Sequence, residues 1–246
     1  MNTPSALVTG ASRGIGLAIA QRLAEAGYAL TVSARREEGL TRAAAQISED
    51  TGATVHSTVA NLAVEDDVRG LAAAHSDRFG SLDVLVLNGG VGTAGSLAET
   101  SMKTYDLTLS VNLRAQFLLI QQCLPLLRKA AAREPNRGGK IVALASITGV
   151  ASEPHLAAYG ASKASLISLC ESVTLEESTH GVTATAISPG FVDTDMTAWK
   201  RDSLGSDTML TTGDVTELVL AVTRLSARAV VPNIVVTRAG DQLWRA

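Results

Sequence analysis

The chain has 246 residues, of which 46% are hydrophobic and 18% are charged, and its formal net charge is −3. A slightly acidic chain gives no reason to expect nucleic acid or an anionic membrane surface as a partner. Aromatic residues make up only 3% of the chain, which is too few for base-stacking platforms. The apolar content at this length is enough to bury one large core.

Cysteine usage and the N-terminus bear on the compartment. The chain has two cysteines, Cys123 and Cys170, without metal-ligand spacing, so no metal site is predicted. Both fall in helical patterns, which predicts buried, reduced thiols and favours a cytoplasmic location. The N-terminal residues lead directly into an apolar run, so no signal peptide is expected. No apolar stretch reaches about 18 residues without a polar interruption, so no membrane span is expected either.

Strand-like and helix-like segments alternate along the whole chain. Short apolar runs predict strands over residues 6–9, 29–33, 54–59, 82–87, 140–145, 182–187 and 233–236. Longer periodic stretches predict helices that end near residue 26 and then cover 37–50, 64–79, 105–129, the region around 159–163, and 214–225. The last helix has Asp214 and Glu217 spaced for its N-terminus. This alternation predicts a single-domain, Rossmann-like α/β fold over residues 1–246, with a doubly wound parallel sheet of about seven strands and helices on both faces.

A glycine-rich turn, Thr9-Gly-Ala-Ser-Arg-Gly-Ile-Gly16, follows the first strand. Gly10, Gly14 and Gly16 let the backbone approach a ligand closely, and the free N–H groups at the start of the next helix face an anion. The spacing differs from the commoner G-x-G-x-x-G. A plain tight turn is the alternative, but the strand before it and the helix after it favour a phosphate site.

Arginines stand where dinucleotide sites distinguish their cofactors. An acidic residue about 20 positions beyond the glycines holds the ribose 2′-hydroxyl of NAD, and an arginine there suits the 2′-phosphate of NADP. The second strand ends in Arg35 and Arg36 without a carboxylate, and Arg13 lies in the glycine turn. Guanidinium groups that converge on one phosphate favour NADP(H) over NAD(H). The alternative is a solvated basic strand end.

Tyr159 and Lys163 are four residues apart, so they lie on one face of a helix, one turn apart. A free phenol titrates near ~10, and a cation within ~4–6 Å favours the phenolate. We therefore expect Lys163 to lower the pKa of Tyr159 and the phenol to serve as proton donor. The pair by itself is weak, because the same spacing occurs on many surface helices.

Other polar residues stand at the carboxyl ends of the expected strands, where doubly wound sheets bind ligands. Asn88-Gly89-Gly90 follows the fourth strand and Ser146 follows the fifth. The sixth strand leads into a turn from Pro189 to Met196, which offers hydroxyl and amide donors. Residues 197–212 are polar, and we expect an irregular, mobile segment there, part of a small substrate lid near 191–212. A nucleophilic serine is disfavoured, because no G-x-S-x-G is present and the histidines lack a recognisable carboxylate partner.

These residues together resemble the short-chain dehydrogenase/reductase family, over nearly the whole length. The resemblance rests on Thr9-Gly-x-x-x-Gly-x-Gly16, Asn88-Gly-Gly90, Asn112, Ser146, Tyr159-x-x-x-Lys163 and Pro189-Gly190, in the family's order and approximate spacing.

The resemblance implies an NAD(P)-dependent enzyme that interconverts carbonyls and alcohols. Tyr159 would protonate the carbonyl oxygen, and Ser146 would hydrogen-bond and position it. Lys163 would hold the nicotinamide ribose, and Asn112 would keep a water behind Lys163. The reactive hydride belongs to the cofactor. The expected cofactor-binding residues are Gly10, Ser12, Arg13, Gly14, Ile15, Gly16, Arg35, Arg36, Asn61, Leu62, Asn88, Gly89, Gly90, Tyr159, Lys163, Pro189, Gly190, Val192 and Thr194.

The chain departs from the family pattern in several places. Asn61 stands where the family usually has an aspartate near the adenine. Gly89 replaces the middle alanine of Asn-Ala-Gly, and we expect that turn to be slightly loosened. Residues 231–240 replace the family's usual glycine-rich C-terminal strand. The family often uses this end of the chain for tetramer contacts, so the resemblance leaves the assembly open. The short segment 197–212 suggests an open lid.

Three functions remain open at this point. The resemblance favours an NADP(H)-dependent reductase of a small free carbonyl compound, in a homo-oligomer (dimer or tetramer). Reduction of a 3-oxoacyl group on an acidic carrier protein is an alternative, because the segment from Pro189 to Met196 is similar to such reductases. Arg128 and Lys129 could dock a carrier, but the glutamates at 171, 176 and 177 oppose it. A non-catalytic NADP(H) sensor is disfavoured by the intact set of catalytic residues, and a sugar-nucleotide epimerase by the short length.

Overall fold

A parallel sheet organises the chain, and its strand order is β3-β2-β1-β4-β5-β6-β7. The computed structural model describes residues 3–92 and 94–240. The strands are β1 (Ser5–Thr9), β2 (Ala29–Ala34), β3 (Val55–Val59), β4 (Val84–Leu87), β5 (Gly139–Leu144), β6 (Val182–Pro189) and β7 (Asn233–Val236). Every residue of β1, β2, β4, β5 and β6 is buried, as expected for a parallel sheet covered on both faces. The prediction of a seven-stranded, doubly wound sheet is confirmed.

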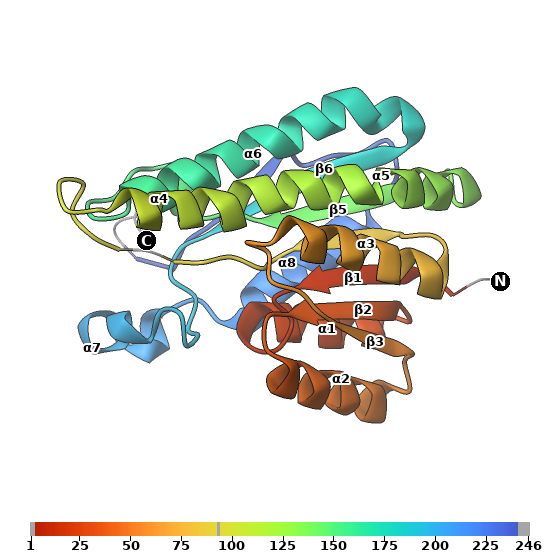
Figure 1. The fold of residues 1–246 in the computed structure, drawn as a ribbon, viewed down its shortest axis with the longest axis horizontal. Helices are drawn as coiled ribbons and strands as arrows, with labels where there is room; N and C mark the ends of the chain where they lie inside the picture. The colour runs from red at the N-terminus through yellow and green to blue at the C-terminus, as the bar shows by residue number, and fades with distance from the viewer. Residues whose placement is uncertain (1–2, 93, 241–246) are drawn as a thin grey trace.

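Helices cover both faces of this sheet (Figure 1). The main ones are α1 (Gly14–Glu25), α2 (Glu37–Thr51), α3 (Glu65–Phe79), α5 (Ala115–Arg133), α6 (Ala157–Glu177) and α8 (Thr212–Arg224). One apolar cluster joins the sheet to α1, α2 and α8, and a second joins it to α3, α5 and α6. Cys123 and Cys170 are free and lie in the second cluster, where burial raises the pKa of each thiol to about 12.

The position of the site follows from the strand order. Numbering runs down from β3 to β1 on one side and up from β4 to β7 on the other, so the order reverses between β1 and β4. The two crossovers leave this point in opposite directions, which opens a crevice at the carboxyl ends of β1 and β4. Thr9 ends β1 and Leu87 ends β4, so the two glycine turns that follow them meet here.

The helix expected over 105–129 is divided in the structure, so that prediction is wrong in detail. A short helix α4 (Met102–Leu109) leads into a π-helical turn, Ser110–Arg114, before α5 begins. A π turn inserts one extra residue into the helical repeat, and such turns are frequent at functional sites. This turn carries Asn112, which is buried.

The segment 197–212 is helical, which corrects the expectation of an irregular loop. Short helices cover Ala198–Lys200, Arg201–Leu204 (α7) and Ser206–Thr208. An ion pair fixes them to the preceding turn, because the Arg201 Nε donates to Asp193 Oδ1 at 2.6 Å. The short helices are thus held by a local ion pair, although the segment lacks the apolar periodicity that predicts a helix.

The start of α8 also differs in one residue from the expectation. Thr211 and Asp214 form a capping box, in which each side chain bonds the other's backbone N–H. Glu217 takes no part in it and pairs instead with Arg22 of α1 at 2.7 Å. In the part of the chain that the structure describes, no helix is long and apolar enough to cross a bilayer.

A buried histidine lies at the other end of the sheet from the crevice. His75 of α3 is fully buried, and its ring nitrogens lie 2.8 Å from Thr31 Oγ1 and 3.1 Å from the Ser81 carbonyl oxygen. Burial lowers the pKa of His75 from 6.5 to about 4, because the imidazolium would lose its hydration.

The burial of His75 predicts that the free energy of unfolding falls as the pH is lowered. Because the folded pKa lies below the unfolded one, the neutral ring contributes its full stability above pH 6.5 and loses it as the pH falls toward 4. The complete loss amounts to about 3 kcal/mol. In His75→Gln, we expect the fall in unfolding free energy between pH 6.5 and 5 to be smaller than in the wild type. Denaturant unfolding at several pH values measures it, with the exposed His180→Gln as control, and equal slopes would contradict the assignment.

Candidate active site

The first glycine turn is shaped by close backbone contacts. Gly10 and Gly14 have positive φ angles of 67° and 56°, which favour glycine. A Cβ on Gly16 would lie 2.4 Å from Asn88 Nδ2 and 2.4 Å from the Gly10 carbonyl oxygen. Arg13 begins α1 without a side-chain cap, so the first N–H groups of the helix stay open to an anion. The turn therefore fits a pyrophosphate at the N-terminus of α1.

The second turn, Asn88 to Gly90, is locked onto the first. Asn88 Nδ2 donates to the carbonyl oxygens of Thr9 (2.9 Å) and Gly10 (3.2 Å). The Thr9 hydroxyl oxygen accepts from the backbone N–H groups of Asn88 (3.0 Å) and Gly89 (2.9 Å). From α5, Gln116 Nε2 donates to the Gly89 carbonyl at 2.9 Å. Thr9 and Gln116 hold the crevice in shape, and neither was among the expected site residues.

Gly89 is tightly packed, which corrects the expectation of a loosened turn. A Cβ at this position would lie 2.6 Å from Leu62 Cδ1 and 3.3 Å from Thr9 Cβ. The Leu62 side chain therefore fills the space that an alanine methyl would take. The smaller residue and the larger neighbour compensate each other, and sequence spacing alone cannot show such a pair.

Asn112 makes three hydrogen bonds to protein groups. Its Oδ1 accepts from the Val91 N–H at 2.8 Å, and its Nδ2 donates to the Val91 carbonyl (3.0 Å) and to Ser162 Oγ (3.1 Å). These bonds join the π turn to the loop after β4 and to α6. A Cβ on Gly90 would lie 3.1 Å from Asn112 Oδ1 and 3.7 Å from Lys163 Nζ, so the chain passes close to both groups.

Ser146 follows β5 and caps a short helix, Ile147–Gly149. Its Oγ accepts from the Thr148 N–H (3.2 Å) and from the Thr148 hydroxyl (2.9 Å). With its lone pairs occupied, Ser146 directs its own proton outward. Ser146 is also close enough to Tyr159 to influence the pKa of the phenol. Thr148 was absent from the expected residues.

Tyr159 and Lys163 lie near the start of α6, on one face, as their spacing predicts. Lys163 Nζ lies 5.6 Å from the centre of the Tyr159 ring and donates to the Leu144 carbonyl at 2.6 Å. Burial lowers the pKa of Lys163 to about 8. Burial also raises the pKa of Tyr159, partly offset by Ser146. The expected lowering of the phenol's pKa by Lys163 is thus wrong for this structure, because desolvation dominates and the opposing contribution comes from Ser146.

The three arginines are exposed around the crevice, and Arg13 already has a partner. Arg13 Nη1 lies 3.0 Å from Asp195 Oδ2, in an ion pair whose side chains are both mostly exposed. Arg35 and Arg36 lie at the end of β2, where Arg36 caps α2. Ser12 faces the start of α2, since its Cβ is 3.7 Å from the point where a Cβ on Gly39 would lie. The structure does not itself show the guanidinium groups converging.

The remaining predicted residues surround the same crevice. Asn61 Oδ1 accepts from the Ala63 N–H at 3.2 Å, so part of its amide is used in a local turn. Gly190 donates its N–H to Val236 at 2.9 Å. Val192 is buried in the apolar core. Thr194 Cγ2 lies 3.5 Å from the point where a Cβ on Gly14 would lie, so this loop rests against the glycine turn.

A cavity of about 120 Å³ opens beside the hydroxyl groups of Ser146 and Tyr159. Thr148 and Leu156 line one part of it. The other lining residues come from the loops after β4 and β6, namely Gly92, Ala94, Gly190, Phe191, Met196, Thr197 and Trp199. The cavity thus places a carbonyl-sized ligand next to both hydroxyls.

A sequence profile of the short chain dehydrogenases matches residues 4–205. The chain belongs to this family. It is 36% identical to the 3-oxoacyl-[acyl-carrier-protein] reductase FabG of Staphylococcus aureus over 209 residues, which cover 85% of this chain and 82% of that protein.

Solved short-chain dehydrogenases share the architecture. A short chain dehydrogenase from Burkholderia cenocepacia in complex with NADP has a TM-score of 0.82 at 31% identity, covering 96% of each chain. Actinorhodin polyketide ketoreductase with NADPH has a TM-score of 0.86 at 28% identity, covering 96% of this chain and 97% of that one. Family membership identifies this chain as an oxidoreductase, and these neighbours support a nicotinamide cofactor.

In this short-chain dehydrogenase, the sequence predicts a substrate lid over 191–212 but does not identify which of its residues line the cavity. Phe191, Met196 and Trp199 lie in the loop after β6, which has no periodicity to mark its inward face. A usable signal was their composition, since two aromatic residues close together are unusual in a chain that is 3% aromatic. Among the described residues, no group of three or more His, Cys, Asp and Glu side chains is placed to hold a metal ion.

The burial of Lys163 predicts that this residue destabilises the fold. Its folded pKa of about 8 lies below the ordinary 10.5, so the ammonium's burial costs stability fully below pH 8 and not above pH 10.5. The shift corresponds to about 3 kcal/mol, and the lost bond to Leu144 subtracts about 1 kcal/mol.

We therefore expect Lys163→Met to be inactive yet more stable than the wild type by about 2 kcal/mol near neutral pH. The difference should shrink as the pH rises from 8 toward 10.5. Urea unfolding across this range measures it, and Lys129→Met at an exposed position of α5 is the control. A variant that is less stable at neutral pH would show that the ammonium is compensated in the fold.

Proposed function

We propose that this protein is an NADP(H)-dependent oxidoreductase that interconverts a carbonyl compound and its alcohol. One observation carries the proposal: Ser146 and Tyr159 line the same small cavity, and interaction with Ser146 offsets part of the rise that burial gives to the pKa of Tyr159. Such a pair can bind a carbonyl oxygen and deliver a proton to it. The bound nicotinamide would supply the hydride.

Each residue then has a task that its surroundings support. The raised pKa of Tyr159 keeps the phenol protonated at neutral pH, which is the form that donates in reduction. Ser146, held by Thr148, donates toward the substrate oxygen and fixes its position. As the proton leaves Tyr159, the ammonium of Lys163 stabilises the phenolate. Lys163 would also bind the ribose hydroxyls.

Asn112 is proposed as a positioning residue. Its amide joins Val91 to Ser162, and the loop it fixes passes within contact distance of Lys163. A water held by Asn112 stays a prediction, and the second lone pair of Oδ1 is the side-chain acceptor left for it by the three bonds to protein groups.

Replacing the phenol tests the reaction. In Tyr159→Phe the proton donor is lost while the ring stays, so we expect kcat for carbonyl reduction to fall about 10²–10⁴-fold. NADPH oxidation at 340 nm over a panel of ketones, aldehydes and acyl thioesters measures turnover, and NADPH binding by fluorescence should be nearly unchanged. NADPH binding by the wild type without turnover on any substrate would instead favour the sensor.

We propose NADP(H) over NAD(H) because Arg13, Arg35 and Arg36 surround the end of β2 and the glycine turn without a carboxylate at the strand end. The solved relatives with NADP and NADPH support this preference. The expected cofactor contacts along the two glycine turns and the loop from Pro189 to Thr194 belong to the same proposal.

Reversing one charge tests the preference. Arg35→Asp removes a phosphate partner and adds a carboxylate, so we expect the ratio of kcat/KM for NADPH over NADH to fall about 10–100-fold. Arg78→Asp, at the other end of α3 from the crevice, makes the same charge change and should leave the ratio unaltered. An unaltered ratio in Arg35→Asp, or a wild type that prefers NADH, would refute the arginine argument.

A second candidate is the reduction of 3-oxoacyl groups on a carrier protein, which the identity to FabG favours. The surface beside α5 and α6 argues for a free substrate instead. Arg128 is bound to Glu177 by two hydrogen bonds of 2.7 and 2.6 Å, and the exposed Glu171 and Glu176 would repel an acidic carrier. Acyl thioesters in the substrate panel decide between these two.

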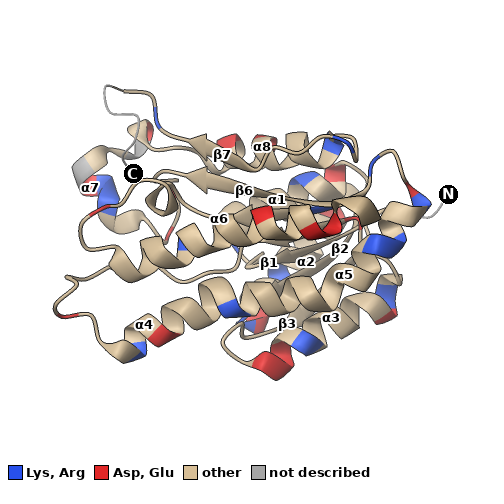
Figure 2. Ribbon diagram, turned by 90° about the horizontal axis from the view of Figure 1, so that it is seen from above, with Lys and Arg blue, Asp and Glu red and all other residues tan. Residues whose placement is uncertain are grey.

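The assembly, lid and location are parts of the same proposal. The sequence of α5 has no charged residue between Arg114 and Arg128, so the middle of this helix is tan in Figure 2, and Phe117 in this stretch is 54% exposed. Such a face supports a homo-oligomer, either a dimer or a tetramer. Residues 191–212 would form a small substrate lid over the cavity. Two buried, free cysteines are compatible with a cytoplasmic location.

A further inference from the structure

A second cavity continues the catalytic one outward. It has a volume of about 360 Å³ and shares Ala94, Leu156 and Trp199 with the cavity at Ser146 and Tyr159. The inner cavity, at about 120 Å³, holds little more than the reacting carbonyl and its nearest atoms. The body of any larger substrate must therefore lie in the outer cavity.

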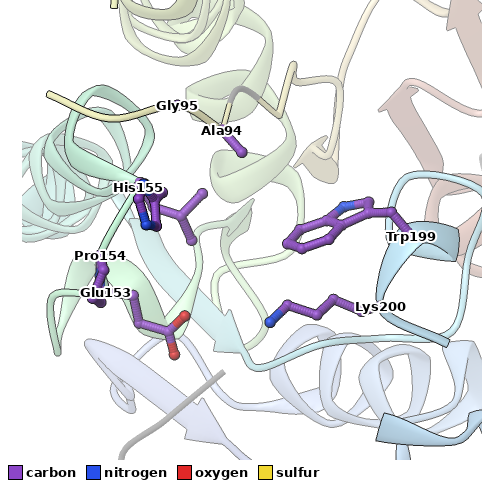
Figure 3. A pocket seen from close by; sticks show the side chains of 8 residues that line it. Ala94, Gly95, Glu153, Pro154, His155, Trp199 and Lys200 are labelled. Carbon is purple, nitrogen blue, oxygen red and sulfur yellow. The ribbon is translucent and has the colours of Figure 1, made fainter. Parts of the chain in front are cut away.

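Trp199 and Lys200 form one wall of the outer cavity, and both contact the ring of Phe191. The rings of Phe191 and Trp199 meet edge to face, with centroids 5.9 Å apart and planes at 88°. Lys200 Nζ lies 5.1 Å from the Phe191 ring and 5.0 Å from the Trp199 ring. These contacts hold the indole in place although 58% of Trp199 is exposed. Figure 3 shows the indole extending into the open space of the cavity.

The opposite wall is fixed by the backbone. His155 is the one non-glycine residue with a positive φ in the described part of the chain, at 65°. Its carbonyl oxygen accepts from the Gly95 N–H at 2.9 Å, which ties the loop after β5 to the loop after β4. A strained residue persists only where its surroundings hold it, so this wall keeps its shape facing Trp199.

Charge in the cavity is balanced. The Glu153 carboxylate and the Lys200 ammonium point toward each other from the two walls (Figure 3). An anionic substrate would meet Glu153, and a cationic one would meet Lys200. The pair therefore gives no advantage to a charged ligand, whereas the apolar face of Trp199 stays available.

We infer that Trp199 is a specificity residue, which stacks on the flat, uncharged ring system of a cyclic ketone whose carbonyl reaches Ser146 and Tyr159. This inference rests on the proposed function and adds the substrate class. A rigid indole gains most from a rigid planar partner, while a flexible alkyl chain must lose its freedom to lie on it. The structure therefore favours fused-ring ketones over linear ketones of equal carbon count.

The test compares 2-tetralone with 2-decanone, which have the same number of carbons. In Trp199→Ala, we expect the ratio of kcat/KM for 2-tetralone over 2-decanone to fall about tenfold, and Trp199→Phe should keep most of the wild-type ratio. Leu175→Ala, at an exposed apolar residue far along α6, is the control and should leave the ratio unaltered. An equal loss for both ketones in Trp199→Ala would overturn the inference.

A binding measurement separates this inference from the reaction. The chain has two tryptophans, so Trp244→Phe leaves Trp199 as the one indole. In a Tyr159→Phe, Trp244→Phe variant with NADP⁺, 2-tetralone should quench Trp199 fluorescence at a lower concentration than 2-decanone. That result supports the aromatic subsite even if the wild type turns over no carbonyl compound of the panel, an outcome that would refute the proposed function alone. Equal quenching by both, or none, would overturn the subsite.

Discussion

The interlock between the two glycine turns is the constraint on which the site depends. Asn88 Nδ2 bonds the carbonyls of Thr9 and Gly10, and it sits where a side chain on Gly16 would have to pass. The sheet's order reverses at this point, so the bonds close the gap between β1 and β4 without filling the crevice above it. Because the glycines let the two turns pack this closely, the first N–H groups of α1 stay open to a phosphate.

The burial of the Lys163 ammonium at this site lowers the stability of the fold. Burial raises the pKa of Tyr159 and lowers that of Lys163, so each group resists its charged form. In the proposed reaction, proton transfer would create a phenolate, which is a partner for the buried ammonium. The cost of burying Lys163 in the ground state would then be offset as charge develops on Tyr159, and such a difference between the states accelerates a reaction.

Most of the fold follows from local rules, and the gaps have physical causes. Apolar runs mark buried strands because a parallel sheet is covered on both faces. The π turn at Asn112 escapes periodicity, since one inserted residue shifts the helix face without altering composition. The mutual fit of Leu62 and Gly89, and the support of Ser146 by Thr148, depend on distances between segments. The direction of the Tyr159 pKa depends on burial, which spacing does not encode.

The site is built from two parts of the fold: the strand ends together with α6, and the loop after β6. The residues proposed to bind the cofactor and to move the proton stand on strand ends and on α6, where main-chain bonds fix them. The residues proposed to contact the substrate, Phe191 and Trp199, stand on the loop after β6, which is held by an ion pair and by an aromatic contact. Loop residues can change without disturbing the sheet, so one catalytic frame can serve many carbonyl compounds. Selectivity in this chain is therefore to be sought in the indole and not in the catalytic hydroxyls.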